Sequence, residues 1–132
     1  MGNLPKIVHE WLIKAEHDLL SARRLADPTE PVRDTAIYHC QQAAEKALKA
    51  LLAWKQTPLQ RTHDLGILHA EVVIHFPQLA PLRDAADLLT PYAVEYRYPG
   101  DVLWPEPDEL DEALAAADAV VSAVRRLLDV RR

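Results

Sequence analysis

The segment from Val32 to Lys55 restricts the fold more than any other, because its apolar residues recur with the period of an α-helix. Drawn as a helix, it has an apolar arc that holds Ile37, Cys40, Ala43, Ala44, Ala47, Leu48, Ala50, Leu51, Leu52 and Trp54. The opposite arc is polar and holds Tyr38, His39, Gln42, Glu45, Lys46 and Lys49. Because alanines let neighbouring helices approach closely, this segment is predicted to be the central helix of a bundle.

Four other segments show the same period and are separated by prolines, which end helices. These helices are expected over residues 4–26, 62–77, 79–96 and from 108 towards the C-terminus. Pro91 is expected to kink the fourth helix or divide it in two. Only three glycines occur, which is few for a β protein rich in hairpins. The predicted fold class is therefore all-α, an antiparallel up-and-down bundle of four to five helices in a single domain over residues 1–132.

Polar residues at two predicted helix starts indicate how those helices are capped. Thr62 is expected to be the N-cap of the third helix, with Asp64 in its first turn near the positive end of the helix dipole. Asp108 is expected to cap the last helix, whose last turns carry Arg125 and Arg126 near the negative end.

The net charge of −5 and the single cysteine limit the classes of function. An acidic protein lacks the basic surface that broad nucleic-acid binding needs. A net negative charge is nevertheless compatible with one small basic pocket on the surface. Cys40 is the only cysteine, so no internal disulfide is possible, which suits a reducing cytoplasm. The N-terminal segment lacks the apolar run of a signal peptide, and no stretch reaches the roughly 18 apolar residues of a membrane span. A cytoplasmic protein without membrane partners is expected.

Four side chains on the polar arc form a strip rich in hydrogen-bond donors. His39, Gln42, Lys46 and Lys49 lie within about 80° of one another at 100° per residue, with Glu45 beside them. Two ammonium groups and an imidazole at this spacing suit a phosphate or a carboxylate. The solvated face of an ordinary amphipathic helix looks the same and is the more common case, so both interpretations stay open.

Gln41 and the segment YAVEYRYPGD, residues 92–101, add two further candidates. Gln41 falls within the apolar arc, so it is expected to anchor a loop or another helix, with ligand contact as the alternative. Arg97 offers a planar fork for phosphate or carboxylate, and Tyr96 and Tyr98 are placed to stack on a base or to cover the guanidinium. Alternatively, the tyrosine rings pack in the core with their hydroxyls in water.

Metal binding and nucleophilic catalysis have weak signals. The six histidines show no spacing of metal ligands such as HExxH, so no metal site and no cofactor are predicted. Cys40 lies on the apolar arc, where a thiol behaves as a small hydrophobe with a raised pKa.

Several segments together resemble the HEPN family (higher eukaryotes and prokaryotes nucleotide-binding). They are KAEHDLLSA in the first helix, YHCQQAAEKALKALL in the second, THDL at the start of the third and VEYRYPGD before the last. The resemblance implies an antiparallel bundle of four or five helices and a homodimer. It also implies a minimal nucleotidyltransferase as partner, as in two-component or toxin–antitoxin systems. Some members of the family are ribonucleases that use an Arg and a His separated by four to six residues, whereas others bind nucleotides or partners.

Arg33 and His39 meet the ribonuclease spacing, but ten arginines and six histidines are enough to produce such a match by chance in a chain of this length. The pair also lies early in the second helix, whereas the ribonuclease members carry theirs near the last helices, and no histidine follows Arg97. We therefore expect a non-catalytic HEPN protein. The alternatives are a metal-independent ribonuclease toxin, with His39 as general acid/base and Arg33 stabilising the phosphorane, and a structural dimerisation module.

The predicted ligand site takes donors from three helices and binds a nucleotide phosphate or an acidic loop of a partner. Its residues are Gln42, Glu45, Lys46, Lys49, His63, Arg97 and Tyr98. In this hypothesis Lys46 and Arg97 supply charge, Tyr98 supplies a stacking face and Glu45 orients the donors. The site requires these side chains to face one shared recess.

Overall fold

The computed structural model describes residues 4–100 and 104–130. Its α-helices are α1 (Lys6–Leu25), α2 (Arg33–Trp54), α3 (Leu65–His75), α4 (Arg83–Leu89) and α5 (Pro107–Val130). Two short 3₁₀ helices, η1 (Pro77–Leu82) and η2 (Thr90–Ala93), flank α4. No strand occurs in the described ranges, so the predicted all-α bundle is confirmed.

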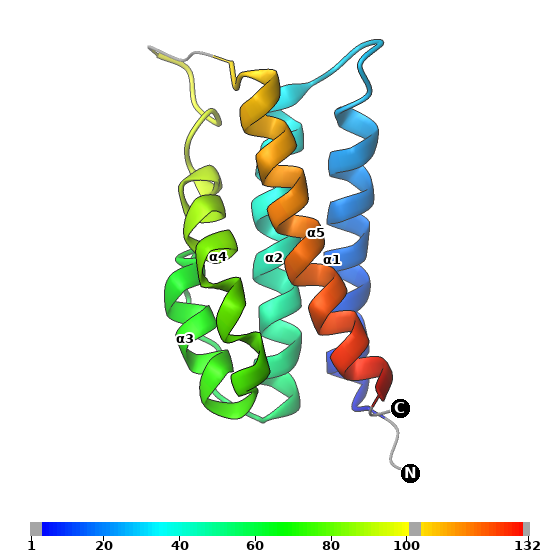
Figure 1. Cartoon of the computed structure of the whole chain (residues 1–132), viewed down its shortest axis with the longest axis vertical. Helices are drawn as coiled ribbons and strands as arrows, with labels where there is room; N and C mark the ends of the chain where they lie inside the picture. The colour runs from blue at the N-terminus through cyan, green and yellow to red at the C-terminus, as the bar shows by residue number, and fades with distance from the viewer. Residues whose placement is uncertain (1–3, 101–103, 131–132) are drawn as a thin grey trace.

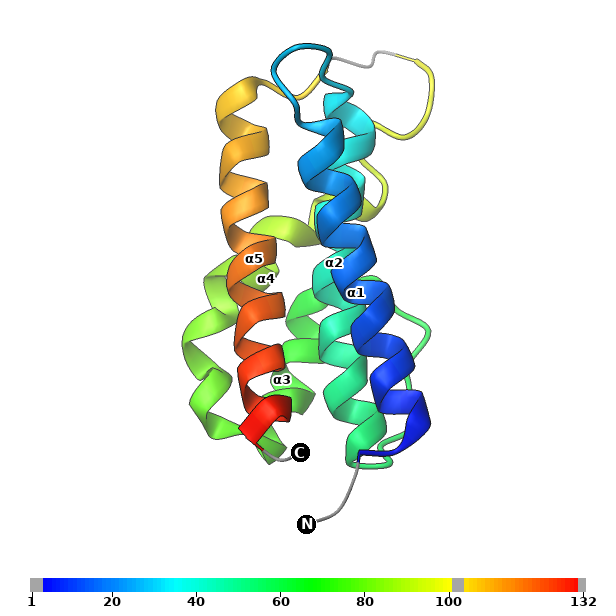
Figure 2. The ribbon, with the colours of Figure 1, turned by 90° about the vertical axis from the view of Figure 1, so that its right-hand side faces the viewer.

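The helices are arranged around α2, which contacts each of the other four α-helices. α1, α2 and α5 lie lengthwise in the bundle, and α3 and α4 pack beside one half of α2 (Figure 1). α1 and α2 run antiparallel, and the turn that joins them lies at the same end of the bundle as the start of α5 (Figure 2). The prediction that residues 32–55 form the central helix is therefore confirmed.

The core follows the apolar arc predicted for α2. Every predicted arc residue from Ile37 to Leu52 is buried, whereas Trp54 is partly buried and stacks on Phe76 with ring centroids 5.5 Å apart. The facing helix contributes side chains at alternating steps of four and three: Val8, Leu12, Ala15, Leu19 and Ala22. The alanines on both faces keep the two backbones close, which is the packing that the sequence predicts.

The start of α3 differs from the predicted cap. Asp64, not Thr62, is the N-cap, since its Oδ1 accepts hydrogen bonds from the backbone amides of Gly66 at 2.9 Å and Ile67 at 3.3 Å. Thr62 lies two residues before this cap, and its Oγ1 accepts a hydrogen bond from the amide of Asp64. An aspartate satisfies these amides better than a threonine would, because its charge also interacts with the helix dipole.

The two polar residues at this start are expected to differ in their effect on stability. Asp64→Ala should destabilise the protein by about 1 kcal/mol, because two amides of α3 lose their acceptor. Thr62→Ala should cost less than half as much, since the one amide that it accepts from lies outside the helix. Urea denaturation of both variants checks this order, and an equal or reversed order would contradict the assignment of Asp64 as the cap.

Prolines account for the other differences from the predicted helix limits. The fourth predicted helix, 79–96, is α-helical only over α4, because Pro81 and Pro91 lack the amide hydrogen that an α-helix uses. α4 ends at Leu89 and passes directly into η2, which contains Pro91, so the α-helix stops beside this proline instead of dividing into two α-helices. The last helix begins at Pro107 rather than after a cap at Asp108, since proline suits the first position of a helix.

Candidate functional site

The polar arc of α2 is engaged by a carboxylate of α1. Asp18, itself buried, places Oδ2 at 2.6 Å from Nζ of Lys46 and Oδ1 at 2.8 Å from Nδ1 of His39. Asp18 thus links α1 to α2, and its negative charge balances the positive charge of Lys46. His39 is oriented through Nδ1 by the same carboxylate.

A second internal cluster surrounds Glu45, which is only 4% exposed. Its carboxylate accepts hydrogen bonds from Lys49 Nζ at 2.8 Å and Gln41 Nε2 at 3.0 Å, and it lies 2.9 Å from His63 Nδ1. Burial alone would raise the pKa of Glu45, but the hydrogen bonds from Lys49, His63 and Gln41 outweigh it and lower that pKa. Glu45 is therefore a buried carboxylate held in its charged form.

Gln41 connects this cluster to the loop before α3. Its Nε2 also donates to the backbone oxygen of His63 at 3.2 Å, and its Oε1 accepts from Gln42 Nε2 at 2.7 Å. The anchoring role expected for this fully buried carboxamide is observed. Polar side chains of α2 thus fix the loop that leads into α3.

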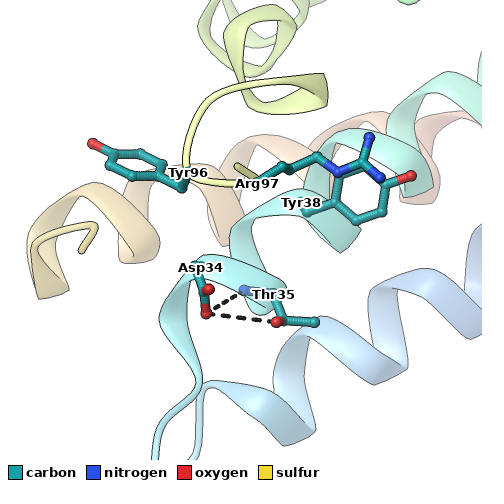
Figure 3. Close-up of a pocket in the computed structure, with 5 residues that line it drawn as sticks. All are labelled: Asp34, Thr35, Tyr38, Tyr96 and Arg97. Carbon is teal, nitrogen blue, oxygen red and sulfur yellow. Dashed lines mark hydrogen bonds between the residues drawn. The ribbon is translucent and has the colours of Figure 1, made fainter. Parts of the chain in front are cut away.

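A separate pocket of about 200 Å³ lies where the segment after η2 passes the start of α2. It is lined by Asp34, Thr35, Tyr38, Tyr96 and Arg97. The guanidinium of Arg97 lies over the ring of Tyr38, with its Cζ 4.2 Å from the ring centroid (Figure 3). The same carbon is 5.6 Å from the ring centroid of Tyr98, so two tyrosines flank the cation.

The tyrosines of this segment are held by α5. The hydroxyl of Tyr92 donates to Glu109 at 2.7 Å and that of Tyr96 donates at 2.9 Å, and the two rings stack with centroids 6.2 Å apart. Burial, the hydrogen bond to Glu109 and its negative charge raise the pKa of Tyr96 to about 12. Of the two tyrosines expected to cover the guanidinium, Tyr98 lies beside it, whereas Tyr96 donates to Glu109 instead. The alternative of rings in the core with hydroxyls in water is met only for the buried ring of Tyr92, since its hydroxyl donates to Glu109.

The backbone of Tyr96 has φ +68°, a conformation that costs a non-glycine residue about 1–3 kcal/mol unless its surroundings hold it. Glu109 on one side and the stacking of Arg97 on the other supply those contacts. Tyr96 and Arg97 point in opposite directions from this turn, Arg97 over Tyr38 and Tyr96 away from it (Figure 3). The turn at Tyr96 therefore places Arg97 against α2 and Tyr96 against Glu109 of α5.

The predicted ligand residues fall into three groups. Arg97 and Tyr98 lie together, Lys46 pairs with Asp18, and the remaining four, Gln42, Glu45, Lys49 and His63, belong to the cluster around Glu45. Of the seven, only Arg97 lines the 200 Å³ pocket. A contact of the other side chains with a ligand stays a prediction.

Sequence reasoning missed four residues that shape the pocket or hold it. Asp34, Thr35 and Tyr38 lie in the first turns of α2, and their spacing of one and four residues places them near one end of one helix. That spacing was a usable signal. Nothing in the sequence distinguished Glu109, because it is one of several acidic residues in the first turns of α5.

Arg33 and His39, the alternative ribonuclease pair, are engaged by different neighbours. Nε of Arg33 donates to the backbone oxygen of Pro105 at 2.7 Å, whereas His39 contacts Asp18. Six residues along a helix also turn the two side chains about 120° apart. The ribonuclease assignment stays a prediction that the side-chain contacts do not favour.

Metal-binding and thiol groups show no arrangement for chemistry in the described part of the chain. Over these residues, no three His, Cys, Asp or Glu side chains gather closely enough to hold a metal ion. Cys40 is fully buried, and burial raises the pKa of its thiol to about 12, so it stays a thiol at neutral pH. None of the helices in residues 4–100 and 104–130 has the length and apolar character needed to cross a membrane.

Comparison with known proteins identifies the family. TT1696 from Thermus thermophilus is similar in structure, with a TM-score of 0.79 and 26% identity over 90% of this chain and 96% of that one. ST0689, an archaeal HEPN homologue, has a TM-score of 0.74 and 24% identity over 92% of this chain and 97% of that one. No curated protein gives a significant match. The model of the HEPN domain matches residues 8–127, nearly the whole length, and the chain therefore belongs to the HEPN family.

Proposed function

We propose that this chain is a non-catalytic HEPN domain that binds a nucleotide-like anionic ligand in the pocket beside Arg97. The observation that carries the proposal is the hydrogen bonding of its guanidinium. Nη1 donates to the backbone oxygen of Ala93 at 3.1 Å, while Nε and Nη2 donate to no residue that the structure describes. Lys46, Lys49 and His63, by contrast, already face a carboxylate.

The free edge of the Arg97 guanidinium suits two oxygens of one phosphate, because Nε and Nη2 are parallel donors. The ring of Tyr98, which is largely exposed, offers a face on which a base can stack. Asp34 and Thr35 line the same pocket and provide acceptors for hydroxyl or N–H groups. An anion that also carries a ring and N–H or O–H groups fits this set better than inorganic phosphate does.

The size of the pocket sets the expected affinity. Its volume of about 200 Å³ is below the roughly 300–1,000 Å³ of pockets that enclose a drug-sized ligand. A mononucleotide would therefore stay partly in solvent, and a dissociation constant between about 1 mM and 1 μM is expected.

Titration with adenosine monophosphate, followed by the melting temperature and by calorimetry, tests the proposal. At ten times its dissociation constant the nucleotide should stabilise the protein by about 1.4 kcal/mol, a rise of roughly 4–8 °C. Inorganic phosphate at equal concentration should give a smaller rise. Arg97→Lys should weaken the nucleotide about tenfold, because a lysine cannot offer two parallel donors, whereas Arg24→Lys on the exposed surface of α1 should not.

An unchanged melting temperature at millimolar nucleotide would contradict the proposal, as would equal affinity of Arg97→Lys and the unmodified protein. The partner expected from the family resemblance, a minimal nucleotidyltransferase in a toxin–antitoxin-type system, is a separate part of the proposal. It is tested by co-purification of the two proteins, and it holds or fails independently of the nucleotide.

A further inference from the structure

A largely apolar groove is lined by residues of the α1–α2 turn, the start of α5 and the segment before it. The α1–α2 turn and the start of α5 lie at the same end of the bundle (Figure 2). One part, of about 320 Å³, and an adjoining part, of about 290 Å³, share Pro31 and Arg33 in their walls. The first part is also lined by Pro107 and Leu110, and the second by Val32 and Trp104. We call this feature the turn groove. It shares no residue with the pocket beside Arg97.

The walls of the turn groove are held in place by the protein itself. Arg33 lines both parts, and its Nε donates to the backbone oxygen of Pro105 at 2.7 Å, which joins α2 to the segment that enters α5. The proline rings in its walls have little freedom to move. A groove that is already formed binds with a smaller loss of entropy than one that must be ordered first.

Large apolar side chains of the turn groove remain uncovered by the described chain. Trp104 is 64% exposed and Val32 is 41% exposed, although Leu110 at the other end is buried. Exposed tryptophan and proline beside a preformed hollow are typical of surfaces that bind another protein.

The two segments that line the turn groove are rich in carboxylates, although Asp34 lines the pocket beside Arg97 and Glu109 binds the hydroxyls of Tyr92 and Tyr96. Residues 24–35 and 104–112 contain eight carboxylates and two arginines, whereas the rest of the chain contains twelve carboxylates and thirteen lysines and arginines. None of these eight carboxylates forms an ion pair with a residue in the described ranges. Asp111 lines the groove. Four more of these carboxylates are adjacent in sequence to the prolines that line it, namely Asp27, Glu30, Glu106 and Asp108.

From this geometry we infer that the turn groove docks a segment of a partner protein that carries apolar side chains flanked by lysine or arginine. The apolar side chains fill the two parts of the groove beside Pro31, and the cations meet the carboxylates at its rim. A nucleic acid or an anionic membrane surface would be repelled by the same carboxylates. A second copy of this chain, joined end to end about a twofold axis, would bring two acidic rims together.

Selection from a phage-displayed library of random linear peptides tests the inference with the full chain as bait. Enriched sequences are expected to combine apolar residues with lysine or arginine. A synthetic peptide of an enriched sequence should bind about tenfold more weakly to the double variant Val32→Ser, Trp104→Ser. It should bind equally to Ile74→Ser, in which a side chain of α3 that is 76% exposed is changed in the same way.

A second variant separates the charge from the apolar surface. Asp108→Lys with Asp111→Lys is expected to lose the basic peptide, and added salt should weaken the peptide on the unmodified protein because these charges are exposed. Unchanged melting temperatures would show that all variants fold. The inference is overturned by the absence of enriched peptides, by enrichment of acidic ones, or by an effect of Ile74→Ser equal to that of the double variant. It is also overturned if light scattering shows a dimer that Trp104→Ser dissociates.

Discussion

Glu45→Ala is expected to destabilise the protein by about 3–5 kcal/mol, a large part of the stability of a domain of this size. The side chains of Glu45 and Lys49 are 5% and 13% exposed, so removing the carboxylate leaves an ammonium group largely buried without its counter-charge. Gln41 and His63 lose the same acceptor. Urea denaturation measures the change as a shift of the midpoint at constant slope.

The matched control for this variant is Glu16→Ala. Glu16 also accepts from a cation at 2.9 Å, but both it and Arg125 are more than a third exposed. An exposed pair contributes about 0–1 kcal/mol, so the control should lie close to the unmodified protein. Equal losses of stability in the two variants would show that the contacts of Glu45 contribute no more to stability than an exposed ion pair does.

The lowered pKa of Glu45 fixes the direction of its pH dependence. A carboxyl group that has a lower pKa in the folded than in the unfolded state stabilises the fold above its unfolded pKa, and that stability is lost as the pH falls through the folded pKa. The difference between the unmodified protein and Glu45→Ala should therefore shrink as the pH falls below about 4.3. Denaturation curves of both proteins at neutral and acid pH measure it, and a constant difference would contradict the assignment.

Leu51→Ala is expected to cost about 2–5 kcal/mol, because the variant leaves a cavity in the middle of the bundle where the surrounding helices cannot close it. Leu51 is fully buried and α2 contacts all the other α-helices. Leu59→Ala makes the same change at a side chain that is 40% exposed and should cost less than about 1 kcal/mol. Equal losses in denaturation experiments would argue against α2 as the centre of the core.

The long helices were predictable to within two residues at each described end because each carries several turns of one period. The range 32–55 became Arg33–Trp54, and 4–26 became Lys6–Leu25. Between Pro77 and Pro107 the pattern is shorter and is interrupted by prolines, so the balance between α and 3₁₀ turns depends on local geometry that a period does not contain. The N-cap of α3 was predicted two residues too early, because capping also depends on local geometry that a period does not contain.

The candidate site was less predictable, because its partners come from elsewhere in the fold. The period of α2 places Glu45 on the polar arc, but it cannot show that the loop with His63 covers this carboxylate. Nor can it show that Asp18 reaches Lys46 across the α1–α2 contact. Arg97 was found from its residue type and its aromatic neighbours, whereas Tyr38 became its stacking partner only through tertiary packing.

The uneven distribution of charge makes the folded protein an electric dipole along its long axis. The eight carboxylates of residues 24–35 and 104–112 lie at one end, and the start of α1 and the end of α5 lie at the other (Figure 1). In an external field, or near a positively charged support, the molecule should orient its acidic end towards the positive charge before any contact is made. Adsorbed to an anion-exchange surface, it would stand upright, with the opposite end of the bundle directed into the solvent.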